Sequence, residues 1–129
     1  MPTTQSSLSM KSILLIDAAT CLLMGAALLV ATGMIACLTG IPQSLLFYAG
    51  VLLVPIGLFM AATGVWWRES SFAIWMIIVG NVLWVVASLA LLSGIIAPNA
   101  LGVIFILAQA VVVAVLAWLE LKAHRSGRS

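Results

Sequence analysis

The sequence predicts an all-α integral membrane protein, an antiparallel four-helix transmembrane bundle with both termini in the cytoplasm. Three observations lead to this prediction. Hydrophobic residues make up 65% of the 129-residue chain and charged residues only 6%, whereas an ordinary soluble domain is about 25% charged. Four apolar stretches are each long enough to cross a bilayer, which takes roughly 20 residues. All Lys and Arg residues fall on one side of these stretches.

The predicted spans cover about residues 12–38, 45–67, 72–92 and 100–121. Turn-forming or charged segments separate them, because Gly, Pro, Ser and Asn punctuate helices. The alternating ten-residue segments of a β-barrel are absent, which leaves helices as the spanning structure. The connections are short, so consecutive helices should lie antiparallel. We therefore expect residues 1–129 to form a single four-span domain.

Capping residues support these boundaries. Ser44 is expected to cap the second span, Ser70 or Ser71 the third, and Asn99 the fourth. Pro55 lies inside the second span, where it could kink the helix. The first apolar run is longer than the core of a signal peptide, so we expect it to be retained.

The basic residues predict the orientation. They flank the spans on one side only, and the other two loops contain none. Positive residues gather on the cytoplasmic side of bacterial inner-membrane proteins, and anionic headgroups attract them there. We therefore expect a bacterial cytoplasmic membrane protein whose cytoplasmic anchors are Lys11, Arg68, Lys122, Arg125 and Arg128.

Tryptophans give a second indication of depth in the membrane. Trp66, Trp67, Trp75 and Trp118 lie at predicted span ends on the cytoplasmic side, where aromatic rings favour the headgroup region. Trp84 instead falls near the middle of the third span.

Asp17 is the one acidic residue expected well inside a span. Burying a charge in a membrane costs about 2.5–3.5 kcal/mol even on the mild insertion scale, so such residues suggest function. Its helical face is small and mildly polar and should point into the bundle. Asp17 could hydrogen-bond a neighbouring helix, pair with Lys11 or Lys122, or exchange protons.

The third and fourth spans carry further polar side chains. Asn81, Trp84 and Ser88 form one stripe, and Gln109 lies near the middle of the fourth span. We expect a hydrogen bond between Asn81 and Gln109, which would align the two helices, although a substrate or ion contact is the alternative.

Glu120 lies near the predicted end of the fourth span, beside Lys122 and His124. We expect it in a solvated charge cluster at the membrane surface, at the same face as Glu69. Asp17 would then be the only acidic side chain inside the bilayer.

Small residues repeat every seven positions in the second span. Gly50, Gly57 and Gly64 form this stripe, and Gly25 belongs to a similar one in the first span. Small residues allow close helix approach in lipid. The stripes could pack the first two spans together or contact another protomer.

The ligand inventory argues against a metal or cofactor. Cys21 and Cys37 lie on one predicted helix, too far apart to form a disulfide within it. Two Cys and one His give too few ligands for a convincing zinc or iron–sulfur site. The positive charge is small, so no nucleic-acid partner is expected.

The sequence is similar to many small four-span bacterial membrane proteins. With Asp17 in the first span, Trp75 within the run Ala73-Ile74-Trp75, and Trp84 in the third, its layout also resembles the small multidrug resistance transporter family. That resemblance covers the layout of the whole chain. It implies four spans, a membrane-embedded carboxylate and proton-coupled transport.

Two functions follow as expectations. The first is a structural or accessory role, in which the bundle packs in an oligomer or as a subunit of a larger membrane complex. The alternative is a proton-coupled small-molecule transporter that uses Asp17. No set of residues is spaced as catalysis requires, so we do not expect an enzyme.

The orientation can be tested with fusions at the C-terminus. A fluorescent protein fused after Ser129 should fluoresce and alkaline phosphatase fused there should be inactive, because the positive-inside rule puts this end in the cytoplasm. Phosphatase fused in the loop at residues 93–99, after three spans, is the matched control and should be active. An active phosphatase at Ser129 would contradict the predicted orientation.

Overall fold

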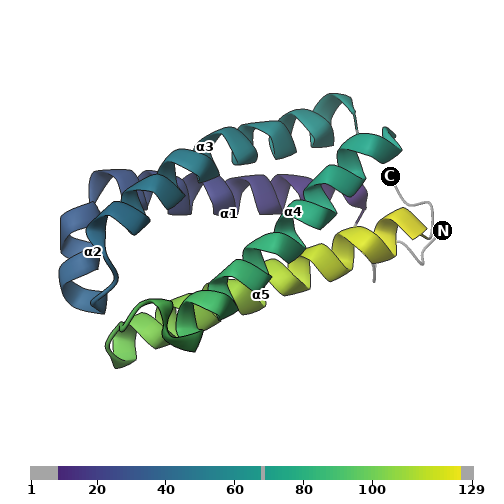
Figure 1. The fold of residues 1–129 in the computed structure, drawn as a ribbon. Coiled ribbons are helices and arrows are strands. Elements are labelled where there is room, and N and C mark those ends of the chain that lie inside the picture. Colours follow the sequence, from purple (N-terminus) through teal and green to yellow (C-terminus); the bar gives the residue numbers. More distant parts are fainter. Residues whose placement is uncertain (1–8, 68, 126–129) are drawn as a thin grey trace.

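Five α-helices form the chain in a computed structural model that describes residues 9–67 and 69–125. Four segments are long and apolar enough to cross a membrane: α1, α3, α4 with the turn that follows it, and α5. Figure 1 shows them packed as a bundle. In chain order the elements are α1 (Met10–Val30), α2 (Thr32–Thr39), α3 (Gln43–Trp66), α4 (Ser71–Ala90), the π-helical turn η2 (Leu91–Ile95) and α5 (Ala100–Arg125).

The first predicted span is divided in two, which corrects the expectation of one helix over residues 12–38. α1 ends at Val30, Ala31 leaves helical geometry at φ −114° and ψ 29°, and α2 begins at Thr32. The Thr32 hydroxyl donates to the Leu28 carbonyl. Such bonds back to the preceding turn often accompany a bend, but they also occur inside the unbroken parts of α1 and α3, so the break is defined by the backbone at Ala31. α2 is therefore a separate short helix that leads into the turn at Gly40, whose φ is 72°.

Two of the three expected caps are present. The Ser70 hydroxyl accepts from the Ala73 N–H at 3.3 Å, and Asn99 Oδ1 accepts from the Gly102 N–H at 2.9 Å. The expectation for Ser44 is wrong, because α3 begins at Gln43 and Pro42 takes the capping position without a side-chain bond. Proline suits a helix start because its fixed φ resembles that of a helix and it has no N–H to satisfy. Further along, α3 continues through Pro55.

The glycine stripe of the second span joins α3 to α1. A Cβ on Gly50 would lie 3.1 Å from the Gly25 carbonyl oxygen, and one on Gly64 would lie 3.2 Å from Leu14 Cβ. Gly57 is closest of the three, with Leu22 Cγ at 2.8 Å from the same hypothetical atom. The stripe thus serves contact within the chain, and α1, α2 and α3 form one tightly packed hairpin.

α4 and α5 form the second hairpin, which runs obliquely to the first (Figure 1). The two hairpins meet mainly where α1 packs against α5, whereas α3 and α4 have few contacts. At one end the Asn99 N–H donates to the Thr39 carbonyl at 3.0 Å, and Asn99 Nδ2 donates to the Leu38 carbonyl at 2.9 Å. The start of α5 is therefore attached to the end of α2.

The outer surface of the bundle is apolar. Val30 is 88% exposed, and many other large aliphatic and aromatic side chains also point outward from the helices. In water such a surface would be strongly unfavourable, but it matches the hydrocarbon core of a bilayer. The protein is therefore an integral membrane protein whose helices contact lipid.

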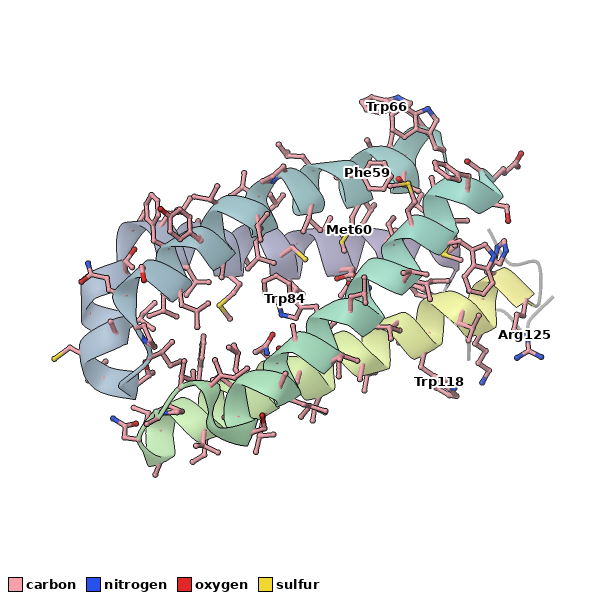
Figure 2. The ribbon with its side chains drawn as sticks, in the orientation of Figure 1. Phe59, Met60, Trp66, Trp84, Trp118 and Arg125 are labelled. Carbon is pink, nitrogen blue, oxygen red and sulfur yellow. The ribbon has the colours of Figure 1, made fainter. Side chains whose placement is uncertain are left out.

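The charged anchors gather where α1 begins and α5 ends. Lys11 lies at the start of α1, and Lys122 and Arg125 lie at the end of α5. Lys122 Nζ is 4.9 Å from the centre of the Trp118 ring. Figure 2 shows Trp66 and Trp118 toward this end and Trp84 near the middle of the bundle. Two further expected anchors, Arg68 and Arg128, lie outside the described residues.

Replacing Gly102 with alanine should destabilise the bundle. The new methyl would lie against the Thr39 carbonyl oxygen and 2.7 Å from Pro98 Cβ. Since backbone must move to relieve this overlap, we expect the Gly102→Ala free energy of unfolding to fall by about 1–3 kcal/mol, the usual cost of overpacking. Thermal unfolding in mild detergent measures it.

Gly80→Ala is the matched control, because a Cβ at Gly80 meets nothing within 4 Å. It should be neutral or slightly stabilising, since alanine favours helix over glycine. Equal unfolding temperatures for the two variants would show that the contact between α2 and α5 does not restrict this position.

Candidate functional site

Three buried polar side chains meet between the two hairpins. Asn81 Nδ2 donates to Asp17 Oδ2 and to Glu120 Oε1, both at 2.9 Å. Asp17 is 1% exposed, Asn81 5% and Glu120 0%. We call these three residues the carboxyl cluster. It joins α1 of the first hairpin to α4 and α5 of the second.

Helical spacing brings each member to the interior. Asp17 shares the buried face of α1 with Leu14 and Cys21, which are one turn away on either side. Asn81 follows Ile77 and Ile78 on the buried face of α4. Residues three and four apart lie on the same side of a helix, so the apolar neighbours carry the polar side chains inward.

The hydrogen bonds of the carboxyl cluster are incompletely matched. An amide NH₂ group has two N–H donors, and Asn81 directs its nitrogen at both carboxyl groups. Asp17 Oδ1 also faces the Cys21 thiol, with the sulfur at 3.7 Å. Glu120 Oε2 is buried without a hydrogen-bond partner. A buried polar atom is normally paired, so this oxygen requires an explanation.

Glu120 corrects the expectation of a solvated surface charge. α5 continues to Arg125, four residues past the predicted end at 121, so Glu120 lies within the helix and not at its end. Its side chain points into the bundle. Gln109, Leu116 and Glu120 are spaced so that they lie on the same face of the helix. This spacing is the feature of the sequence that indicates a buried position for Glu120.

A second polar group, which we call the tryptophan–glutamine chain, lies deeper in the bundle. Trp84 Nε1 donates to Gln109 Oε1 at 2.7 Å, and Gln109 Nε2 donates to Ser88 Oγ at 2.9 Å. Gln109 Nε2 also donates to the Ile106 carbonyl at 3.0 Å, and the Ser88 hydroxyl donates to the Trp84 carbonyl at 2.8 Å. This chain ties α4 to α5.

The expected bond between Asn81 and Gln109 is therefore wrong. Asn81 bonds Asp17 and Glu120, and Gln109 bonds Trp84 and Ser88. Depth estimated from helical rise assumes helices upright in the membrane. In the structure Gln109 lies level with Trp84 and Ser88, one to two turns further along α4 than Asn81.

Two partly open cavities adjoin these polar groups. The first, of about 230 Å³, lies between α3 and α4 toward the α2 end. The second, of about 260 Å³, lies between α1 and α5, and Asp17 is on its wall. Trp84 and Gln109 line both cavities. Figure 2 shows Trp84 extending into the space between the hairpins.

The remaining chemistry-bearing residues lie apart from the carboxyl cluster or support it. His124 Nε2 is 3.3 Å from Ser71 Oγ, and its ring packs edge-on against Trp75. Cys21 is buried with Met60 Sδ at 3.8 Å, whereas Cys37 is exposed and both thiols are free. Within residues 9–67 and 69–125, no three His, Cys, Asp or Glu side chains are grouped to hold a metal ion.

Comparison with protein families, with curated proteins and with solved structures finds no match to this chain.

Removing the amide of Asn81 should destabilise the contact between the hairpins. Asn81→Ala leaves Asp17 Oδ2 and Glu120 Oε1 without their shared donor. Unpaired buried polar groups cost about 1–3 kcal/mol each, so the free energy of unfolding should fall by that order.

The same change combined with Glu120→Leu tests the pairing directly. Residues in contact are non-additive, so Asn81→Ala should cost less in the Glu120→Leu background than in the wild type. Thermal unfolding of the four proteins measures the coupling. Purely additive costs would mean that the two side chains do not interact in the membrane protein.

Proposed function

We propose that the protein is a small proton-coupled carrier that uses Asp17, together with Glu120, to bind and release a proton while it moves a cationic or polar small molecule. The single observation that carries this proposal is the unpaired, fully buried Glu120 Oε2 beside Asp17. Buried polar atoms in proteins are nearly always paired, so an unpaired carboxyl oxygen beside a second carboxyl group indicates a bound proton. A proton held by the two carboxyl groups supplies the missing donor.

The electrostatics support one exchangeable charge. Two carboxylates so close together repel each other when both are ionised, especially in a medium of low dielectric constant. Binding one proton and binding one cation are therefore alternative ways to lower the negative charge of the pair by one unit. When a cation arrives, the proton leaves one carboxyl oxygen, and the net charge of the cluster is unchanged.

The geometry also offers a route to the cluster. Asp17 lines the 260 Å³ cavity between α1 and α5, whose other walls are mainly apolar and include Val112 and Val113. A lipophilic molecule with one positive charge fits such a cavity, because its body contacts apolar walls and its charge meets a carboxylate. Intramembrane carboxylates facing a cavity commonly mark transport pathways.

The proposal includes location and orientation. We place the chain in a bacterial cytoplasmic membrane with both termini in the cytoplasm. The support is the group of basic residues at the start of α1 and the end of α5, together with the tryptophans at that end.

A structural or accessory role, in an oligomer or a larger complex, is the second candidate. The apolar side chains on the outside of the bundle would suit a partner helix as well as lipid. We rank this role below transport because the stripe of Gly50, Gly57 and Gly64, its main sequence support, faces α1 of the same chain. A structural or accessory role also gives no reason for the unpaired oxygen of Glu120.

Proteoliposomes test the transport proposal. Vesicles with an acidic interior and trapped DNA should accumulate ethidium, a lipophilic cation whose fluorescence rises on DNA, because outward proton flow drives inward cation flow. Collapsing the pH gradient should stop the uptake. Asp17→Asn, which keeps the size of the side chain and removes its charge, should reduce uptake to that of protein-free vesicles.

Glu120→Gln should also abolish gradient-driven uptake, whereas Glu69→Gln is the matched control and should transport normally, since Glu69 is exposed and outside the cluster. Each variant is first shown to keep the wild-type size in detergent. Uptake by Asp17→Asn with unchanged pH dependence would refute proton coupling. If the substitution only lowers yield or dissociates an assembly, the accessory role is favoured.

A further inference from the structure

The cavity between α3 and α4 has a size and a chemistry that select a particular kind of molecule. It has about 230 Å³ of space and takes its walls from all four spans. An apolar cavity of about 150 Å³ in another protein stays dry and holds benzene. A space somewhat larger than that accommodates two fused aromatic rings.

The walls favour an aromatic occupant. Leu28, Leu46 and Leu53 contribute aliphatic surface, while Trp84 and Phe105 contribute rings. Aromatic pairs in offset or edge-on contact gain about 0.5–1.5 kcal/mol beyond the burial of their area. A flat ring system is thus a better match for these walls than a flexible chain of the same volume.

Apart from the hydroxyl of Tyr48, the polar side chains of the wall have no donor to spare, whereas Gln109 and Ser88 can each accept a further hydrogen bond. Trp84 Nε1, both amide hydrogens of Gln109 and the Ser88 hydroxyl all donate within the tryptophan–glutamine chain. Gln109 Oε1 and Ser88 Oγ each keep acceptor capacity, because each oxygen has two lone pairs. Tyr48 lines the same cavity and is 64% exposed.

We infer that this cavity binds a neutral bicyclic aromatic molecule that carries one N–H or O–H donor. The ring system fills the apolar space, and the donor meets the acceptor oxygen of Gln109 at its inner wall. Gln109 Oε1 already accepts from Trp84 Nε1, and a donor on the ligand would use its second lone pair, which a lipid acyl chain cannot do. α3 and α4 have few contacts with each other, so the molecule enters from the hydrocarbon region between them.

This inference goes beyond the proposed function. Asp17 is not among the residues that line this cavity, so binding requires no change in the protonation of the carboxyl cluster. Trp84 and Gln109 form part of both cavities. An occupant of the first cavity would therefore touch the same side chains that face the route to Asp17.

Indole is the probe, because it is bicyclic and has one N–H donor. Protein in phosphatidylcholine nanodiscs is titrated with fluoroindole and followed by fluorine NMR, with empty nanodiscs as the background. We expect saturable binding that indole reverses. Benzofuran, which has the same shape with an oxygen in place of the N–H, should compete about three- to tenfold more weakly, as the loss of one hydrogen bond predicts.

Two variants test where the probe binds. Ala49→Phe and Ala87→Phe each put a ring into the cavity from opposite walls, and both should abolish saturable binding. Ala114→Phe, on an exposed part of α5 outside both cavities, is the matched control and should bind normally. Binding that survives both cavity-filling variants would refute the site.

The remaining outcomes are also decisive. Equal competition by benzofuran and indole would refute the hydrogen bond. If fluoroindole does not saturate, and a spin-labelled phospholipid quenches tryptophan more in the wild type than in Ala49→Phe, an acyl chain occupies the cavity and the inference is wrong. Asp17→Asn should bind fluoroindole as the wild type does, so loss of transport and loss of binding are distinguishable.

Discussion

The two hydrogen bonds of Asn81 are the interaction on which the arrangement of the hairpins depends. Each hairpin is held together by its own contacts. In the first, α1 packs against the glycines of α3. In the second, the tryptophan–glutamine chain joins α4 to α5. Between the hairpins, the amide of Asn81 joins Asp17 to Glu120. Lipid offers no alternative partner for a polar group, so the relative position of α1, α4 and α5 is restricted at this point.

The same constraint explains the cavities. The hairpins are joined along α1 and α5, at the carboxyl cluster, and where Asn99 meets the end of α2. α3 and α4 have few contacts with each other. Space therefore remains on both sides of Trp84, and one side reaches Asp17. The carboxyl cluster joins the two hairpins at one depth in the bundle. The cavities beside Trp84 remain open, and small molecules can reach polar side chains there.

The sequence predicts the features that depend on neighbouring residues along the chain. It does not predict the features that depend on packing between helices. Apolar runs of about 20 residues determine the spans, so their number and approximate limits could be predicted. The break at Ala31 could not, because neither proline nor glycine stands at that position to mark it. The inward position of Asp17 follows from its helical face. The partners of Asn81 depend on how α1, α4 and α5 are positioned relative to one another, which the sequence does not show. The sequence alone places Glu120 at the membrane surface, because the apolar run of the fourth span ends at residue 121. The helix itself continues to Arg125.

The order in which the chain is made has a consequence for the carboxyl cluster. α1 and α3 emerge first, and their close contact at Gly25 and Gly50 uses only residues already synthesised. Glu120 belongs to the last turns of α5 and emerges from the ribosome after α1, α3 and α4. Until then Asn81 lacks the Glu120 acceptor, although it can already bond Asp17. A chain without α5 would therefore leave one N–H donor of Asn81 unpaired in lipid, where no water is present to replace the missing acceptor.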